Sequence, residues 1–280
     1  MSLEPAALAT LISESCGLPF EGRRLAGANT LQLYPSGLPV QNTFTIQTAV
    51  GWRSVEVAFV PGSFASELVR HIGLADAGAR SSCAAVLARC LRDGATVNLK
   101  INNHPAKPDD PSGWDAEWMR LELSVRRGQL DLGNGDEDNE KICAWTQQVT
   151  AAIVALLPLE QEEVLTENLQ GGFPEGAKVQ VEVNRYERDR RNRAAALAIH
   201  GYACLVCTSD LGDRYGPVAV GLIEIHHLTP VSKLGPDYSI NPATDLVPLC
   251  PNCHRVAHRR DPPFSIEELK AMIVSLPQPA

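Results

Sequence analysis

The chain contains 280 residues, which favours two domains over one because a compact domain usually has about 100 to 200 residues. Hydrophobic residues make up 44% of the sequence, charged residues 21% and aromatic residues 5%, a composition that excludes disordered and fibrous proteins. Its most hydrophobic stretch, residues 151–159, is far shorter than the roughly 18 apolar residues of a membrane helix, and the first 30 residues show no basic leader. We therefore expect a cytoplasmic protein with no membrane partner.

The net charge of −8 is distributed unevenly. Residues 1–177 contain 13 Lys and Arg against 22 Asp and Glu, a net charge of −9, whereas residues 178–280 contain 12 against 11, a net charge of +1. The acidity therefore lies in the N-terminal part. It does not argue against DNA binding by the C-terminal part, although it argues against a large nonspecific basic surface.

The first 157 residues have the patterns of an α+β domain. Apolar and polar residues alternate on both sides of Gly51 and Trp52, which predicts a β-hairpin, and two helical stretches follow that stop at Gly73 and Gly94. The later alternation predicts half-buried strands and places Trp118 on a polar face. In chain order we predict strands at 43–48 and 54–60, helices at 64–72 and 79–91, strands at 97–102 and 118–126, and a helix at 139–157.

An acidic run that leads into Gly171, Gly172 and Pro174 is typical of a linker. We therefore predict an N-terminal α+β recognition domain at residues 1–158, a linker at 159–177 and a C-terminal domain at 178–280.

Four of the eight cysteines form two close pairs, Cys204 with Cys207 and Cys250 with Cys253. Two such CxxC turns can enclose one tetrahedral zinc ion when the intervening chain folds back, and four sulfur ligands make a closed, structural site. The alternative is that these are buried or redox cysteines. The other four (Cys16, Cys83, Cys90 and Cys143) have no ligand spacing and are interpreted as buried small hydrophobic residues.

Four histidines lie between and after the cysteine pairs. An alternating stretch predicts a strand that ends in His226 and His227, whose side chains point to opposite faces. One imidazole of the pair can then hold a metal while its neighbour addresses water or substrate. His254 and His258 are four residues apart and share one face of a helix, which allows both to bind one ion.

Residues from about 181 to 275, with the motif Glu224, His226, His227, Asp245 and the two helix histidines, resemble the HNH (ββα-metal) nucleases, and most of all the McrA-type restriction endonucleases with a four-cysteine zinc site. The resemblance implies that His226, His254 and His258 bind the catalytic divalent ion (Mg²⁺, Mn²⁺, Co²⁺ or Ni²⁺) and that His227 is the general base. Asp245 departs from the asparagine that is usual in the family; we expect it to be structural. Glu224 either orients an imidazole or is an ordinary polar strand residue.

Contacts to double-stranded DNA are expected mainly from basic residues near the nuclease motif. A loop tryptophan could stack on a base, although tryptophan is more often a core residue. The candidates are Arg188, Arg191, Arg255, Arg259, Lys100, Arg120 and Trp118. His71, His104 and His200 are interpreted as ordinary core or surface residues.

Since McrA-type enzymes combine an HNH module with a sensing domain, the resemblance implies a restriction endonuclease that targets DNA with methylated or hydroxymethylated cytosine. The alternatives are an HNH nuclease of a toxin or mobile element and a non-catalytic zinc protein that binds DNA. A homodimer is a reasonable guess, because double-strand cleavage requires two active sites.

Overall fold

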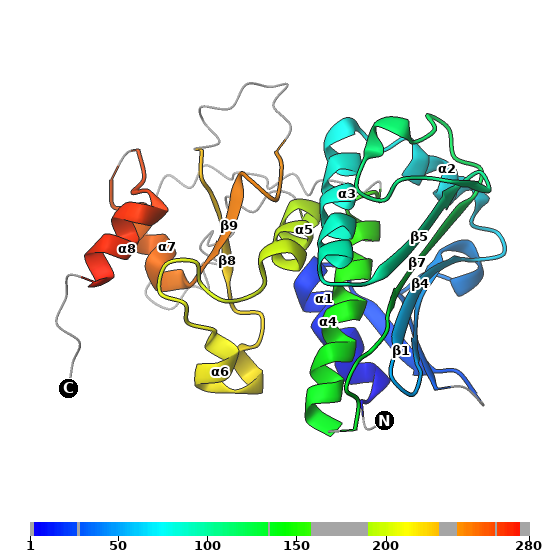
Figure 1. The fold of residues 1–280 in the computed structure, drawn as a ribbon, viewed down its shortest axis with the longest axis horizontal. Helices are drawn as coiled ribbons and strands as arrows, with labels where there is room; N and C mark the ends of the chain where they lie inside the picture. Colours follow the sequence, from blue (N-terminus) through cyan, green and yellow to red (C-terminus); the bar gives the residue numbers. More distant parts are fainter. Residues whose placement is uncertain are drawn as a thin grey trace, which may run out of the picture.

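The computed structural model describes residues 3–26, 29–133, 135–157, 190–229, 240–260 and 262–274. They form a mixed α+β structure, as predicted, with a larger N-terminal part and a smaller C-terminal part that meet at helix α5 (Arg190–His200) (Figure 1). The predicted linker, residues 159–177, lies outside the described residues. Among the helices that are described, none is both long and apolar enough to cross a membrane.

The predicted elements of the N-terminal part are present with small changes in their bounds, except at the start of the strand predicted at 118–126. Both predicted helices before residue 94 are present, and the second begins with Asp76, whose side chain accepts a hydrogen bond from the Ala79 amide. The elements are α1 (Pro5–Cys16), β1 (Phe20–Arg24), β2 (Thr30–Pro35), η1 (Val40–Asn42), β3 (Phe44–Val50), β4 (Val55–Pro61), α2 (Ser66–Gly73), α3 (Ala77–Arg92), β5 (Thr96–Ile101), β6 (His104–Pro105), η2 (Pro111–Gly113), β7 (Leu121–Arg127) and α4 (Gly135–Val154).

In the described part of the chain, the strands form a seven-stranded sheet in the order β1-β2-β3-β4-β7-β5-β6, and every neighbouring pair is antiparallel. Helices α1, α3 and α4 cover one face of this sheet (Figure 1). The opposite face is turned away from the helices and from the C-terminal part. The strand alternation that predicted half-buried strands corresponds to these two faces.

The main hydrophobic core lies between the sheet and its helices. Leu31, Ile46 and Val57 from the sheet are fully buried there. A buried hydrogen bond of 2.9 Å also joins the hydroxyls of Thr48 on β3 and Thr146 on α4. The core therefore fixes the helix layer on one face of the sheet. The opposite face takes no part in this packing.

Helix α5 belongs to both parts of the molecule. Ala194, Ala195, Ala198 and Ile199 pack into the main core, whereas Leu197 packs into the smaller core of the C-terminal part. Alanine side chains allow such close approach on several sides of one helix. The two parts are thus joined through a shared helix.

The C-terminal part is a small antiparallel hairpin followed by a helix. His226 on the first strand pairs in register with Val247 on the second. Its elements after α5 are α6 (Leu211–Tyr215), η3 (Pro217–Ala219), β8 (Glu224–His227), β9 (Leu246–Leu249), α7 (Pro251–Ala257) and α8 (Ile266–Val274). The sequence of hairpin and α7 is the ββα arrangement that the resemblance implies.

The prediction for the chain before β7 was wrong. Trp118 is completely buried and Met119 is 73% exposed, the reverse of the predicted faces. The strand begins only at Leu121, and before it Asn102 receives hydrogen bonds from the amides of Met119 and Arg120 at 2.7 and 3.2 Å. A side chain thus replaces the strand ladder at this point, so the alternation does not extend through it.

The four cysteines outside the CxxC pairs lie in the N-terminal part, as interpreted from the sequence. Cys16, Cys83 and Cys90 are buried, and Cys143 is half-buried. Burial raises the pKa of the Cys16 and Cys143 thiols to about 11 and that of Cys90 to about 12. These thiols are therefore un-ionised packing groups at neutral pH.

Candidate metal centres and active site

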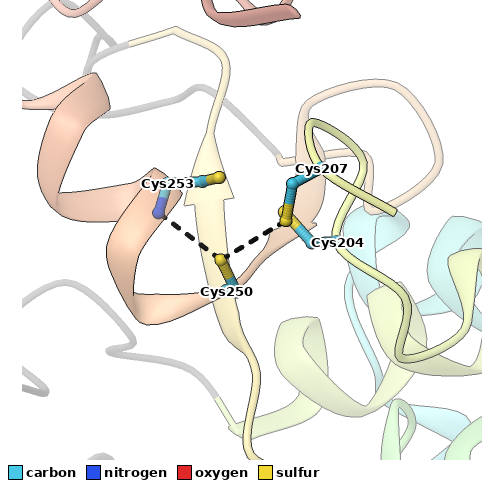
Figure 2. A group of neighbouring side chains, drawn as sticks. All are labelled: Cys204, Cys207, Cys250 and Cys253. Atoms are coloured by element: carbon cyan, nitrogen blue, oxygen red, sulfur yellow. Dashed lines mark hydrogen bonds between the residues drawn. The ribbon is translucent and has the colours of Figure 1, made fainter. Parts of the chain in front are cut away.

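The two CxxC turns bring their four sulfurs together. Cys204 and Cys207 lie in the loop after α5, and Cys250 and Cys253 lie at the start of α7 (Figure 2). Their sulfur atoms all lie within 4.8 Å of one another. The Leu205 amide donates a 2.9 Å hydrogen bond to the Pro248 carbonyl, which holds the first turn against β9.

The geometry of this group fits zinc. Zinc–sulfur bonds of about 2.3 Å in a tetrahedron place the sulfurs about 3.8 Å apart, and the Sγ atoms of Cys207 and Cys250 are 3.7 Å apart. Burial and the neighbouring sulfurs raise the pKa of Cys253, whereas hydrogen bonds with Ser209, Cys204 and Cys250 outweigh burial and lower the pKa of Cys207 to about 7. The two thiols therefore differ in how readily they ionise, and a divalent cation is the partner that allows all four cysteines to be thiolates.

Three of the four motif histidines form a second group. His226 on β8, His254 on α7 and His258, which caps the C-terminus of α7, offer nitrogen atoms that lie within 4.8 Å of one another. The ring centroids are 4.8 to 5.2 Å apart, and the Nε2 atoms of His254 and His258 are separated by 3.2 Å. The predicted pairing of the two helix histidines on one face is thus present. Exposure increases from buried His226 to exposed His258, so the group opens to solvent on one side.

The environment of His226 favours a neutral ring that can act as a ligand. Burial, followed by the charges of His254 and His258, lowers the pKa of His226 to about 3. Its buried Nδ1 has no hydrogen-bond partner among the described residues. Nδ1 of His254 contacts a carboxylate oxygen of Glu224. When Nδ1 of the neutral ring carries the proton, Nε2 keeps its lone pair, and this atom faces His258.

The histidine group therefore fits a divalent cation of the kind that imidazole binds. It differs from the cysteine group in the number of coordination positions that the protein leaves open. Three neutral ligands do not fill a coordination sphere and do not cancel the charge of a cation. The four-cysteine site is closed, whereas the histidine site would keep open positions. Glu224 lies at the position of a residue that orients a ligand, one of the two interpretations open from the sequence.

His227 follows His226 on β8, is half-buried, and is outside the three-histidine group. Burial, followed by the charge of His254, lowers its pKa, and the nearby Asp245 carboxylate opposes that shift. His227 is thus beside the candidate metal site and largely unprotonated at neutral pH.

Asp245 closes the loop that leads into β9. Its carboxylate accepts hydrogen bonds from the Asn241 amide at 2.8 Å and the Thr244 hydroxyl at 2.9 Å. Its backbone carbonyl accepts a 2.9 Å bond from the Leu228 amide just after β8. Asp245 thus ties β9 to the end of the strand that carries His226 and His227, and its carboxylate does so as an acceptor.

Among the basic residues on and after α7, Arg255 and Arg259 are exposed, and no protein partner of their side chains is found in the described part of the chain. Arg260, in contrast, binds both carboxylate oxygens of Glu268 at 3.0 and 2.8 Å and covers the Phe264 ring. Arg255 and Arg259 therefore remain candidates for phosphate contacts beside the histidine group.

The basic run before the first cysteine has internal contacts. Arg190 donates a 2.9 Å hydrogen bond to the Gly17 carbonyl, and Arg193 donates a 3.0 Å bond to the Ile223 carbonyl. Arg191 is half-buried on α5. Arg188 lies outside the described residues. This run helps to hold α5 between the two parts of the protein.

The three candidate DNA contacts of the N-terminal part have different outcomes. Lys100 forms a 2.9 Å ion pair with Glu122, and Arg120 is exposed. Trp118 is corrected: its ring is buried against Trp114, and its Nε1 donates to the Asp115 carbonyl at 2.8 Å, so it cannot stack on a base. Trp52, at the turn between β3 and β4, is 88% exposed.

The remaining histidines lie outside the three-histidine group. His71 is near Glu67 on α2, His104 is exposed on β6, and a ring nitrogen of His200 is 3.0 Å from the Pro242 carbonyl. These are ordinary packing and surface positions.

Sequence reasoning missed a hollow on the helix-free face of the sheet. Gln32, Thr45 and Gln47 lie in it, at positions that alternate with core residues on β2 and β3. The signal was available for β3, where Thr45 and Gln47 alternate with Phe44 and Ile46. An alternating pattern identifies a polar face, but it cannot show that loops at one end make that face concave.

Residues 204–260 match the family model of HNH endonucleases. The match runs from the first cysteine of the four-cysteine group to Arg260, just after α7, and includes all four motif histidines. No curated protein and no solved structure matches the chain. The C-terminal part thus contains an HNH domain with a possible four-cysteine metal site, and the seven-stranded sheet lies outside the match.

Proposed function

We propose that this protein is a metal-dependent DNA endonuclease that hydrolyses phosphodiester bonds at the group formed by His226, His254 and His258. The observation that carries the proposal is the convergence of these three rings on one solvent-open site, with His227 next to His226 on β8. The match of this segment to HNH endonucleases supports DNA as the substrate. The four-cysteine group supports a structural zinc ion that braces the site.

In the proposed reaction, His227 accepts a proton from the attacking water while the water oxygen forms a bond to phosphorus. One phosphorus–oxygen ester bond breaks, and the departing oxygen takes a proton from solvent. The lowered pKa of His227 keeps its ring unprotonated and able to act as the base. Glu224 keeps the His254 ring in one orientation through its contact with Nδ1.

A divalent ion held by His226, His254 and His258 would supply positive charge for the phosphate oxygens. Arg255 and Arg259 would bind neighbouring phosphates of the same strand, because both are exposed close to the histidine group. Asp245 would keep the strand that carries His227 in place.

The N-terminal part, residues 1–158, is proposed to select the DNA, and residues 178–280 to cut it. In this proposal the selected feature is methylated or hydroxymethylated cytosine, and the enzyme restricts DNA that carries it. The support is the two-part architecture, with an α+β unit of its own core joined to the HNH domain. Cutting of both strands requires two sites, so a homodimer on DNA is part of the proposal.

The test is cleavage of matched duplexes that contain cytosine, 5-methylcytosine or 5-hydroxymethylcytosine, each with Mg²⁺, Mn²⁺, Co²⁺ or Ni²⁺. His227→Ala is expected to lower the cleavage rate at least about 100-fold, the usual contribution of a general base. His104→Ala, an exposed histidine remote from the site, is the matched control and should cleave normally. Light scattering of the protein on DNA reports the oligomeric state.

Cleavage of the modified duplexes alone, lost in His227→Ala, would support the whole proposal. Equal cleavage of all three duplexes would keep the nuclease and reject the selection of modified cytosine. Full activity of His227→Ala would reject the assigned base, and no cleavage under any ion would reject the nuclease.

A further inference from the structure

The helix-free face of the sheet carries a cavity of about 430 Å³ at one end. Its lining includes Arg23, Gln32, Thr45, Gln47 and Ser63. Three of these residues form a row across neighbouring strands, because Arg23 on β1 pairs in register with Gln32 on β2, and Gln32 pairs with Gln47 on β3. The next residue in the row is Ala58 on β4, whose small side chain leaves space beside Gln47.

The floor of the cavity is a fixed chain of hydrogen bonds. Arg23 Nε donates to Gln32 Oε1 at 2.7 Å, and Gln32 Nε2 donates to Thr45 Oγ1 at 3.3 Å. Gln32 is 6% exposed and Thr45 is 3% exposed, so both are buried polar groups. Since Thr45 accepts from Gln32, its own hydroxyl proton is available to an acceptor in the cavity.

Gln47 has hydrogen-bonding capacity that the protein does not use. Its side chain is half-buried, and no partner for its amide is found in the part of the chain that the structure describes. The same holds for the two terminal nitrogens of Arg23, whose guanidinium otherwise lies 5.5 Å from the Tyr34 ring centre. The cavity thus presents a donor–acceptor amide, a hydroxyl and a guanidinium fork.

The wall of the cavity is pre-formed. The amides of Gly62 and Phe64, after β4, donate 2.7 Å hydrogen bonds to the carbonyls of Thr43 and Gln41, before β3. A Cβ atom at Gly62 would lie 2.4 Å from the Val40 and Gln41 carbonyl oxygens, so the two loops approach as closely as glycine allows. Val40 and other apolar residues supply surface for the face of a flat ring.

We propose that this cavity binds a single nucleotide. Amide and hydroxyl groups such as those of Gln47 and Thr45 match the alternating donors and acceptors on the edge of a base. Arg23 is the charged residue of the lining and suits the phosphate. The volume lies within the range of small-molecule sites, about 300 to 1,000 Å³.

The nucleotide has two possible sources: a base turned out of a DNA duplex, or a free nucleotide in solution. Binding of a base from duplex DNA rests on the proposed nuclease function, because the HNH domain is the part proposed to bind DNA. The cavity is separate from the histidine group in either case, since helices α1, α3 and α4 stand between the sheet and the C-terminal part (Figure 1).

The first experiment measures binding of dCMP, 5-methyl-dCMP, dTMP, dAMP and dGMP to the full-length chain by calorimetry. Gln47→Leu removes the unpartnered amide at nearly constant size, and Ser63→Trp fills the mouth of the cavity from an exposed position. Each is expected to weaken binding at least about tenfold, the effect of losing one or two well-made hydrogen bonds. Asn98→Leu, an exposed amide on β5 of the same sheet face, is the matched control and should bind as the wild type does.

The second experiment measures base extrusion in the full-length His227→Ala chain, which is expected to bind DNA without cutting it. Duplexes carry 2-aminopurine beside a cytosine, a 5-methylcytosine or a 5-hydroxymethylcytosine, and its fluorescence rises when the neighbouring base leaves the stack. A rise that Gln47→Leu and Ser63→Trp abolish and Asn98→Leu preserves would support the DNA source. Nucleotide binding in the first experiment without this rise would support the free nucleotide.

Equal signals from the two cavity variants and the control would overturn the inference, as would the absence of both nucleotide binding and extrusion. Neither readout requires cleavage. A chain that fails to cut DNA can therefore still bind a nucleotide here. Normal cutting of modified DNA by the Gln47→Leu and Ser63→Trp chains would reject the reading of a base by this cavity, and the first experiment alone would then decide whether it binds a free nucleotide.

Discussion

Removal of zinc should unfold the HNH domain and leave the N-terminal part folded. Among the described residues, the small core of the C-terminal part contains fourteen buried residues, and three of them are the cysteines Cys204, Cys250 and Cys253. Structural zinc contributes an apparent free energy of about 10 to 16 kcal/mol at neutral pH, as much as or more than the whole stability of about 5 to 15 kcal/mol of an ordinary domain. A Cys253→Ala chain should therefore lack a folded HNH domain even when zinc is supplied.

The distribution of tryptophans makes this prediction easy to measure. All four tryptophans lie in the first 157 residues, and Trp114, Trp118 and Trp145 are buried in the main core. Tryptophan emission therefore reports on the N-terminal part alone. Hydrogen exchange of β8 and β9 reports on the HNH domain, and a colorimetric chelator counts the zinc released.

We expect a strong chelator, or Cys253→Ala, to abolish amide protection in β8 and β9 while tryptophan emission stays constant. Helix α5 should keep most of its protection, because four of its residues belong to the main core. Cys143→Ala is the matched control, since Cys143 lies outside the metal group and should leave one zinc per chain bound. Full protection of β8 and β9 in the metal-free chain would refute the reasoning.

Three further outcomes follow from particular contacts. Glu224→Ala should raise the metal concentration for half-maximal cleavage about 10- to 100-fold, because it removes the partner of His254 Nδ1; an unchanged metal requirement would contradict this. Arg255→Ala and Arg259→Ala should each reduce the slope of log affinity for DNA against log salt concentration by about 1, measured by fluorescence anisotropy. Burial raises the pKa of the Tyr202 phenol to about 12, so the unfolded chain ionises first and stability should fall as pH rises from about 10 to 12, a dependence that Tyr202→Phe should remove in denaturant titrations.

The site was predictable from the sequence because its chemistry is locally encoded. Two CxxC turns, an adjacent histidine pair on a strand and two histidines four residues apart each define their own geometry, so the ligand sets could be assembled without a fold. The same holds for β3 and β4, which are consecutive and joined by a short turn. The contact of Glu224 with His254 was not fixed in this way, since it joins two elements thirty residues apart.

The features that could not be predicted depend on pairing between strands that are distant in the sequence, or on a local contact that interrupts the alternating pattern. Helix α1 was missed although Pro5 stands at its first turn and Gly17, with a φ of 68°, ends it. The pairing of β4 with β7 joins strands that are far apart in the sequence, so it depends on how the whole sheet is assembled. Trp118 was misplaced because the Asn102 side chain interrupts the strand pattern, which alternation alone cannot reveal.

The joint between the two parts has a consequence for where DNA would be cut. Helix α5 packs on α3 and α4 on one side and on β9 on the other. Arg89 from α3 donates to the Ile199 carbonyl at 3.3 Å, Gln147 from α4 contacts the Tyr202 hydroxyl, and Arg193 binds the Ile223 carbonyl. These contacts hold the HNH domain at a set distance from the sheet.

If the cavity on the sheet reads a base, that base and the histidine group of the same chain are separated by at least two layers of helix. Each layer is about 10 Å thick, so the separation is at least about 20 Å, or about six nucleotides at 3.4 Å each. Cleavage should then occur at a constant displacement from a single modified base, mapped on end-labelled strands. Cuts adjacent to that base would show that one chain does not both read and cut through this joint.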